Sequence, residues 1–288
     1  MIKIREKLNH ITILYVPVVE SVKLIVQEHY DTPEYENCIV CVNVLPDIND
    51  NERDLLKGYS KRIYYMLEHK IPDYDYYNKH FCVWDNDVIW QIGYFGIDEM
   101  WTMDWCPQFA LRCVEQHNIQ IKYKPVRYTT LIKKDNSCKT PIKTVDCCIV
   151  GVISNDIANY RYNVIKEIEN KHLFSLKIIT QCYNMESVTQ ELDTSKFILD
   201  IPREDFIITQ NQVRIFELLC MGYTVISKKC DINLFPDLVY EYETVDDINK
   251  IVQLGEYLHP TEAYKEMTYT DEAYENYVNN LIRLQDGV

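Results

Sequence analysis

The chain has 288 residues, which is enough for two domains of ordinary size. Hydrophobic residues make up 47% and charged residues 26% of it, which excludes a disordered or fibrous protein. The formal net charge of −14 makes the chain poorly suited to long nucleic acids, whose phosphates attract clustered lysine and arginine. The chain contains neither an apolar run of about 18 residues nor a signal-type segment after its N-terminus. We therefore expect a cytoplasmic protein without a membrane span.

The first part of the chain, residues 1–131, is predicted to form one α/β domain. Its expected strands are 11–18, 22–30, 38–45, 62–67, 99–103 and 119–123, and its expected helices are 51–59, 80–95 and 104–117. Asp98 and Glu99 are expected to bound their strand. A polar segment with a proline, residues 132–145, is the predicted linker.

Residues 146–256 are predicted to form a second α/β domain. Its expected strands are 147–153, 174–180, 197–201, 223–227 and 238–240, and helices are expected from 160, over 185–192, around 214 and from 246. Strict alternation of strand and helix favours a parallel sheet covered on both faces. The acidic tail, residues 257–288, has a helical pattern, and analogy with other two-domain folds predicts that it packs back on the first domain.

The eleven cysteines do not indicate a metal site or a disulfide framework. Cys38 and Cys41 lie in an expected strand, where the period of two places their side chains on opposite faces. No second pair completes a set of four zinc ligands. We expect reduced, buried thiols and no bound metal.

The segment 211–227 carries the strongest functional signal. Asn211, Arg214 and Glu217 are each about one helical turn apart, Gly222 stands where a helix ends in a left-handed residue, and a β-branched strand follows. A cation and a carboxylate at the start of a helix, just beyond a strand end, suit a phosphorylated ligand rich in hydroxyls. The alternative is an ordinary amphipathic helix with a surface ion pair.

These residues resemble a known family. Asn-x-x-Arg-x-Phe-Glu, followed by Gly and Thr-Val-Ile-Ser, resembles the donor-sugar half of GT-B glycosyltransferases. The resemblance implies that Glu217 holds donor hydroxyls and that Arg214 faces the diphosphate. Upstream, the segments 62–69, 98–104 and 123–128 are similar in order to the acceptor-side domain of a bacterial and viral branch of the family. Together they imply an α/β fold of two Rossmann-like, doubly wound domains that face a cleft.

The loop 154–159 follows the first strand of the second domain, which is the phosphate side of a doubly wound sheet. Ser154 and Asn155 are therefore candidate donor ligands. Arg161 occupies the position where relatives carry an arginine just inside the helix. The loop has no glycine, so it also fits a polar loop with a solvated arginine.

Candidates for the catalytic base lie in the first domain. Glu68 and His69 come just past the carboxyl end of a strand. His69 has the ordinary pKa for proton removal near neutrality, and Glu68 would serve if desolvated. Both also fit surface charges after a strand. His10 is a further candidate, whereas the pair Asp85 and Asp87 falls in a helical pattern, where it fits a solvated face better than a metal site.

We therefore predict a metal-independent glycosyltransferase, a hexosyl- or pentosyltransferase without a bound cofactor. It would move a sugar from a nucleotide-sugar donor to a hydroxyl of a glycan, protein or small-molecule acceptor. The second glutamate of many retaining members is replaced by Thr209, so the stereochemistry stays open. The alternatives are a catalytically degenerate module that binds a nucleotide or protein partner, and a phage-type DNA-base glycosyltransferase, against which the net charge argues.

Overall fold

A computed structural model describes residues 3–42, 50–67, 82–102, 116–124, 126–132, 142–151, 160–180, 185–202, 212–230, 233–258 and 263–265. The described residues fall into two compact units, unit 1 up to Arg127 and unit 2 from Tyr128. Most of the expected linker and tail lies outside the described residues. The predicted domain boundaries, and the cleft that the resemblance implies, stay predictions.

Unit 1 is built on sheet A, whose strands lie side by side in chain order. The strands are β1 (Ile4–Lys7), β2 (Thr12–Tyr15), β3 (Cys38–Val42), β4 (Lys61–Met66), β5 (Glu99–Thr102) and β6 (Gln120–Tyr123). β1 pairs antiparallel with β2, and all the other pairs are parallel. The helices are α1 (Glu20–Ile25), α2 (Asp50–Leu56) and α4 (Cys82–Phe95), with short turns η1 (Pro17–Val19), η2 (Val26–Tyr30) and η3 (Pro33–Tyr35).

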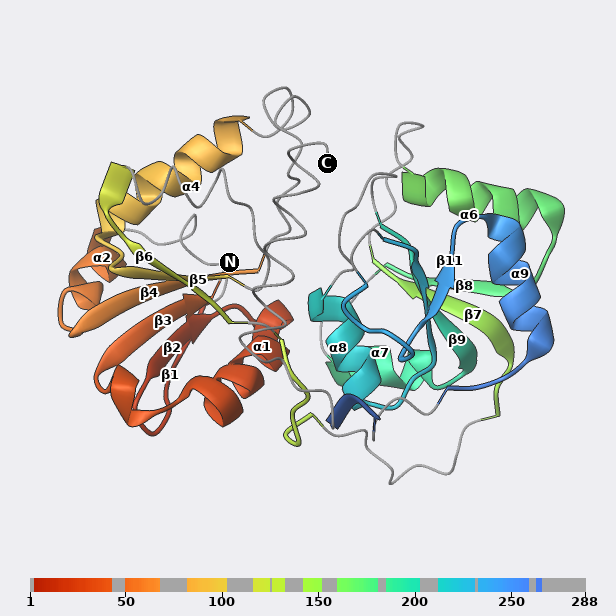
Figure 1. The fold of residues 1–288 in the computed structure, drawn as a ribbon, viewed down its shortest axis with the longest axis horizontal. Coiled ribbons are helices and arrows are strands. Elements are labelled where there is room, and N and C mark those ends of the chain that lie inside the picture. Colours follow the sequence, from red (N-terminus) through yellow and green to blue (C-terminus); the bar gives the residue numbers. More distant parts are fainter. Residues whose placement is uncertain are drawn as a thin grey trace. The chain divides into compact units, whose positions relative to one another are not determined.

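Helices cover both faces of sheet A (Figure 1). On one face, Leu56 of α2 and Ile92 of α4 join a buried cluster with side chains of β2 to β5. On the other face, the segment from α1 to η3 brings Tyr30 and Tyr35 edge-on to the ring of Trp101, with centroids 5.6 and 5.0 Å apart. The apolar residues of the strands thus form two cores, one on each face.

The predicted strand at 22–30 is wrong, because this segment forms α1 and η2. Its β-branched residues suggested a strand. The buried residues Val22, Ile25, Val26 and Tyr30 instead follow a helical spacing, and that spacing allows one side of a helix to cover sheet A. The short hairpin strand β1 was not expected from the sequence.

Unit 2 is built on sheet B, in which every pair of strands is parallel. Its strands are β7 (Val145–Val150), β8 (Leu176–Ile179), β9 (Ser195–Asp200), β10 (Val225–Lys228) and β11 (Tyr240–Tyr242). Its helices are α6 (Tyr160–Lys171), α7 (Met185–Leu192), α8 (Gln212–Cys220) and α9 (Val245–Leu254). The elements expected in this half of the chain are present within a few residues of their predicted bounds.

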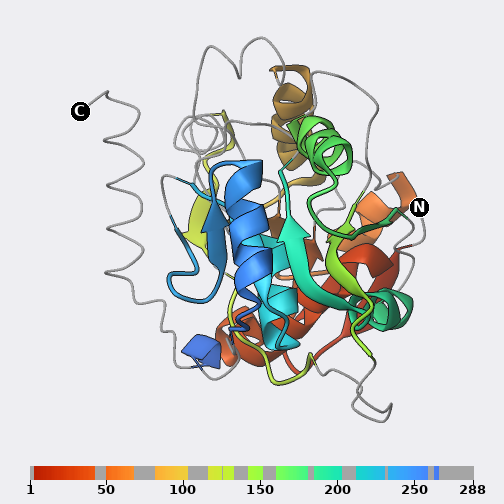
Figure 2. The same cartoon turned by 90° about the vertical axis from the view of Figure 1, so that its right-hand side faces the viewer.

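Sheet B lies between two layers of helices (Figure 1), and Figure 2 shows α9 in front of it. Ile165 of α6 and Ile248 of α9 share a buried cluster with β7, β9, β10 and β11. On the opposite face, Ile215 and Phe216 of α8 are completely buried. Gly222 has a φ of 77°, which confirms the predicted left-handed stop after α8. The predicted α/β fold with two parallel-sheet units is confirmed.

The strand order marks where unit 2 can hold a ligand. Sheet B has the order β11-β10-β9-β7-β8, so the chain leaves β7 first towards β8 and then crosses to β9 on the other side. In open parallel sheets, ligands bind beyond the carboxyl ends of the strands at such a reversal. The described strands of sheet A contain no such reversal. A ligand-binding site is therefore expected at the carboxyl ends of β7 and β9.

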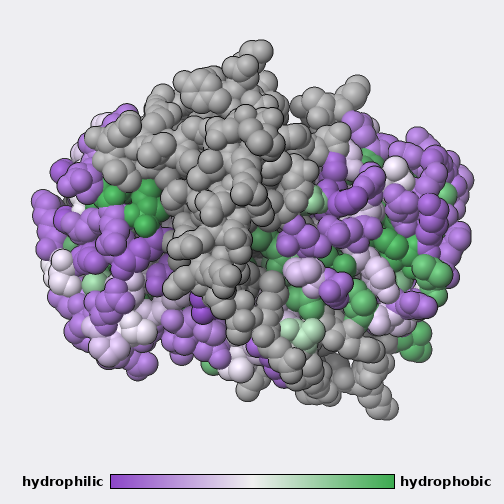
Figure 3. Space-filling model, in the orientation of Figure 1, coloured by the Kyte–Doolittle hydropathy of each residue, from purple (hydrophilic) through white to green (hydrophobic). Residues whose placement is uncertain are grey.

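Hydrophilic residues cover most of the described surface on the face drawn in Figure 3, interrupted by small hydrophobic patches. The most exposed large hydrophobic side chains include Trp90, Ile142 and Leu254. Within the described part of the chain, every helix is too short or too polar to cross a membrane.

Candidate functional site

The candidate site begins at Gly151, the residue directly after β7. Its φ of 144° belongs to a region that residues with a side chain rarely adopt. A Cβ added at Gly151 would lie 3.0 Å from Nη1 of Arg161 and 3.6 Å from Nη2 of Arg214. Both guanidinium groups thus lie against the end of β7, and the missing side chain leaves the backbone open to close approach.

The two arginines reach this point from opposite faces of sheet B. Arg161 is the second residue of α6, and its Nε donates a hydrogen bond of 2.7 Å to the carbonyl of Ile201, just past β9. Arg214 belongs to α8, and its Nη1 donates to Oδ1 of Asp200 at 2.9 Å. Each guanidinium is therefore held in place by a group at the end of β9.

Asp200 is the buried anchor of this arrangement. It is the last residue of β9, its exposed fraction is 1%, and its Oδ2 accepts a hydrogen bond of 3.3 Å from the hydroxyl of Ser227 on β10. Buried carboxylates are stable only when they are paired and hydrogen-bonded, as this one is. Asp200 therefore sets the direction of Arg214.

A second group of polar side chains lies next to this pair. Tyr160 precedes Arg161 in α6, and the Nζ of Lys228, the last residue of β10, is 4.0 Å from the centroid of its ring. Tyr242, which ends β11, is 1% exposed, and burial together with nearby Tyr160 and Asp200 raises its pKa well above the usual range. Its hydroxyl therefore stays protonated at neutral pH.

The chemistry of this edge of sheet B is that of an oxyanion site. Arginine presents a planar set of donors that matches phosphate or carboxylate oxygens, and two arginines at one glycine suit a polyvalent anion. Among the described residues, no cluster of three histidine, cysteine, aspartate or glutamate side chains is placed to hold a metal ion. The cysteines at 38, 41, 147, 148, 220 and 230 form no disulfide, and all of them except Cys230 are buried.

The structure brings together two of the predicted donor ligands, Arg161 and Arg214, at one glycine. Glu217 lies one turn further along α8 and is half-buried, and its predicted role stays a prediction. Ser154, Asn155 and Asn211 lie outside the described residues, as do the candidate bases Glu68 and His69.

His10 is not placed to act as a base at a carboxyl edge of sheet A. It lies in the turn between β1 and β2, at the amino end of β2, with its Nδ1 2.7 Å from a carboxylate oxygen of Glu36. This arrangement fixes a turn.

Gly151, Asp200 and Ser227 were not predicted from the sequence. The loop 154–159 has no glycine, whereas Gly151 comes directly after the strand and before that loop. An aspartate that ends an apolar strand, as in Phe-Ile-Leu-Asp at 197–200, is a signal that was present in the sequence.

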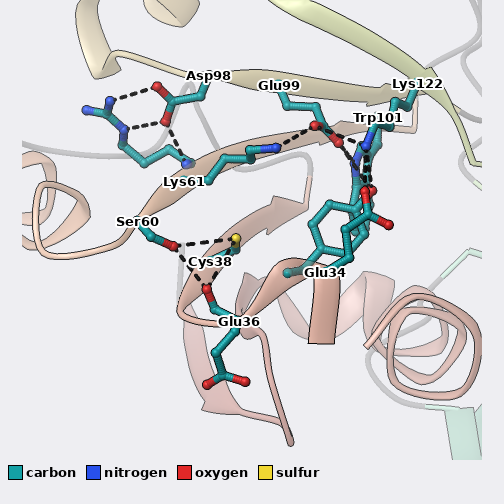
Figure 4. Close-up of polar contacts among 11 residues, drawn as sticks. Glu34, Glu36, Cys38, Ser60, Lys61, Asp98, Glu99, Trp101 and Lys122 are labelled. Atoms are coloured by element: carbon teal, nitrogen blue, oxygen red, sulfur yellow. Dashed lines mark hydrogen bonds and ion pairs between the residues drawn. The ribbon is translucent and has the colours of Figure 1, made fainter. Parts of the chain in front are cut away.

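A charged cluster of unit 1 lies at the amino ends of its strands, whereas the candidate site of unit 2 lies at carboxyl ends. Glu99 is completely buried between Lys61 and Lys122, at 3.0 and 3.4 Å, and accepts a hydrogen bond of 2.6 Å from the indole of Trp101 (Figure 4). Asp98 pairs with Arg62, and although burial opposes it, this pairing lowers the pKa of Asp98. Both carboxylates stand at the amino end of β5, where they tie neighbouring strands together.

Neither a protein-family model nor a curated protein matches the chain. Solved structures show weak likeness. The apo form of the lipopolysaccharide outer core galactosyltransferase WaaB is 12% identical over 92% of this chain and 78% of its own, with a TM-score of 0.42. The T4 phage BGT in complex with UDP and Mn²⁺ is 11% identical over 94% and 93%, with a TM-score of 0.49. The calicheamicin glycosyltransferase CalG4 is 7% identical over 86% and 72%, with a TM-score of 0.31. Likenesses of this size carry no functional argument.

Proposed function

We propose that the chain is a glycosyltransferase whose nucleotide-sugar donor places its diphosphate against Gly151, between Arg161 and Arg214. The observation that carries this proposal is the convergence of two guanidinium groups, from helices on opposite faces, at the strand reversal of sheet B. A nucleotide sugar is a glycosyl donor whose leaving group, a nucleoside diphosphate, is a polyvalent anion.

The arginine pair supplies what such a reaction needs at the leaving group. Negative charge grows on the diphosphate as its bond to the sugar breaks, and preorganised cations stabilise that charge more than they stabilise the intact donor. Asp200 and the carbonyl of Ile201 fix the two guanidinium groups in advance, so little reorganisation is required. We propose that these cations take the place of a divalent metal.

The other roles follow from the resemblance to GT-B glycosyltransferases and belong to the same proposal. Glu217 would accept hydrogen bonds from donor hydroxyls, and Ser154, Asn155 and Asn211 would complete the donor site. Glu68 or His69 would take the proton of the acceptor hydroxyl.

The proposal is tested by replacing Arg161 and Arg214 with alanine, one at a time. We expect each variant to bind inorganic pyrophosphate at least about tenfold more weakly in calorimetry, because a hydrogen bond to a charged group contributes about 1.5–3 kcal/mol. Each should also lose hydrolysis and transfer in a panel of UDP, GDP and ADP sugars, while chelation of metals with EDTA leaves the wild type active.

The matched control is Arg53→Ala in α2, whose guanidinium lies over the ring of Tyr94 in unit 1. It should bind pyrophosphate like the wild type. If both site variants keep full affinity, the arginine pair is not the diphosphate site. Binding without hydrolysis or transfer of any sugar nucleotide would instead leave a nucleotide-binding module without catalysis.

A further inference from the structure

We propose that the carboxyl ends of β10 and β11 form the subsite for the donor's sugar, in which Tyr242 and Lys228 donate hydrogen bonds to sugar hydroxyls. This inference rests on the proposed function, because it requires the diphosphate to lie against Gly151. It adds two residues that neither the sequence pattern nor the family resemblance singled out.

The backbone places these two residues beside the arginine pair. Lys228 and Tyr242 are register partners in the parallel pairing of β10 with β11, so their side chains leave the same face of sheet B. That face also carries α6. Its first residue is Tyr160, over whose ring the Nζ of Lys228 lies, and its second residue is Arg161. On the neighbouring strand pair, Ser227 is the register partner of Asp200, which holds Arg214.

The hydroxyl of Tyr242 is the group that indicates a bound ligand. Its oxygen is buried, and among the described residues only the side chain of Tyr160 is near enough to share a hydrogen bond with it, without the geometry of a full one. A buried hydroxyl without a well-formed hydrogen bond destabilises the fold, so such a group is rare unless something else binds it. Because Tyr242 ends β11, it stands at the carboxyl edge of sheet B, the edge at which the arginine pair lies.

The chemistry of the cluster favours a sugar over a nucleobase. A base needs an open aromatic or apolar face on which to stack, and the ammonium group of Lys228 already lies over a face of the Tyr160 ring. An ammonium donates three hydrogen bonds, and a protonated phenol donates one and accepts others. These groups match the alternating donors and acceptors of a sugar ring.

The test compares Tyr242→Phe with Tyr240→Phe, which removes a hydroxyl from the same strand and the same face, two residues nearer the amino end. Calorimetry measures the affinity of each variant for inorganic pyrophosphate, for UDP, GDP and ADP, and for their glucose conjugates. We expect Tyr242→Phe to weaken binding of the glucose conjugate about three- to tenfold, the loss that fits one hydrogen bond. Pyrophosphate and the nucleoside diphosphates should change less than about twofold, and Tyr240→Phe should change nothing.

A second variant, Lys228→Met, keeps the test decisive if Tyr242→Phe fails to fold, and should show the same selective loss. The proposed function fails on its own terms if wild-type protein does not bind pyrophosphate. The sugar subsite is overturned if pyrophosphate binds but the variants weaken the nucleoside diphosphate as much as its glucose conjugate, which would place the base there. It is equally overturned if they leave the glucose conjugate unaffected.

Discussion

Gly151 is the residue at which the backbone of unit 2 lies against the guanidinium groups of Arg161 and Arg214. With a φ of 144° and no side chain, it lets two guanidinium groups approach the end of β7 from opposite faces. Arg161 and Arg214 alone do not define a site, because arginines on two helices acquire a common target only where both side chains are held. Asp200 and the carbonyl of Ile201 provide that restraint.

At this scale we predict the effect of Gly151→Ala. The added Cβ would lie 3.0 Å from Nη1 of Arg161, so the guanidinium must shift, and the backbone at this φ is strained as well. We expect about a tenfold or greater loss of pyrophosphate affinity in calorimetry, with circular dichroism showing that the fold is retained.

The matched control is Gly58→Ala, because a Cβ at Gly58 meets only the carbonyl oxygen of Leu55 at an ordinary 3.5 Å. Its affinity for pyrophosphate should equal that of the wild type. Unchanged affinity in Gly151→Ala would show that this backbone position does not face the anion.

At the scale of elements, the two ends of the strands of unit 2 carry different groups. The carboxyl ends of β7, β9 and β10 carry the candidate site, whereas the amino ends are tied together by Asp146 at the start of β7. Its carboxylate accepts hydrogen bonds from Lys196 of β9 at 2.7 Å and from the backbone of Ser175, just before β8, at 3.0 Å. The hydrogen bond from Lys196 is the main cause that lowers the pKa of Asp146 from 3.8 to about 2, in spite of partial burial.

This pairing predicts a pH dependence of stability. Since the pKa of Asp146 is about 2 in the folded chain and 3.8 in the unfolded chain, the fold favours the ionised form. The pairing therefore stabilises the protein fully above the unfolded pKa and loses its effect as the pH falls from about 3.8 to about 2. Asp146→Asn should lower the free energy of unfolding at neutral pH by up to about 1 kcal/mol, the value of a partly exposed pair.

Urea unfolding of both proteins between neutral and acidic pH measures this difference, which should shrink towards zero at the acidic end. Asp237→Asn, at an exposed position in the turn before β11, is the control and should show little difference at any pH. A gap between wild type and Asp146→Asn that stays constant into the acidic range would contradict the assignment.

At the scale of the whole molecule, the two units have separate cores and different sheet orders. Only the sheet of unit 2 contains a strand reversal within the described residues, and the proposed diphosphate site lies at that reversal. The buried Glu99 cluster of unit 1 ties strands at their amino ends and contributes to that unit's stability instead.

Hydrogen exchange tests whether the diphosphate site lies in unit 2. With saturating pyrophosphate, we expect amides of β7, β9 and α8 to exchange more slowly, because an anion bound to the native state suppresses local opening around it. Amides of β3 to β5 in sheet A should be unaffected, and Arg214→Ala should abolish the protection in unit 2. Equal protection of sheet A would contradict a site confined to unit 2.

The sequence by itself determined the α/β class, most strands and helices and the helix stop at Gly222, and it predicted Arg161 and Arg214 as donor ligands. These follow from local periodicity and from the residue types that bind phosphate, which are properties of short segments. The strand predicted for residues 22–30 was wrong, because β-branched residues also occupy helices when their spacing matches a buried face. Only the tertiary structure decided that the two arginines meet at Gly151 and that Asp200 holds one of them. These contacts depend on the order in which distant strands pair, and that strand order cannot be derived from the spacing of residues in the sequence.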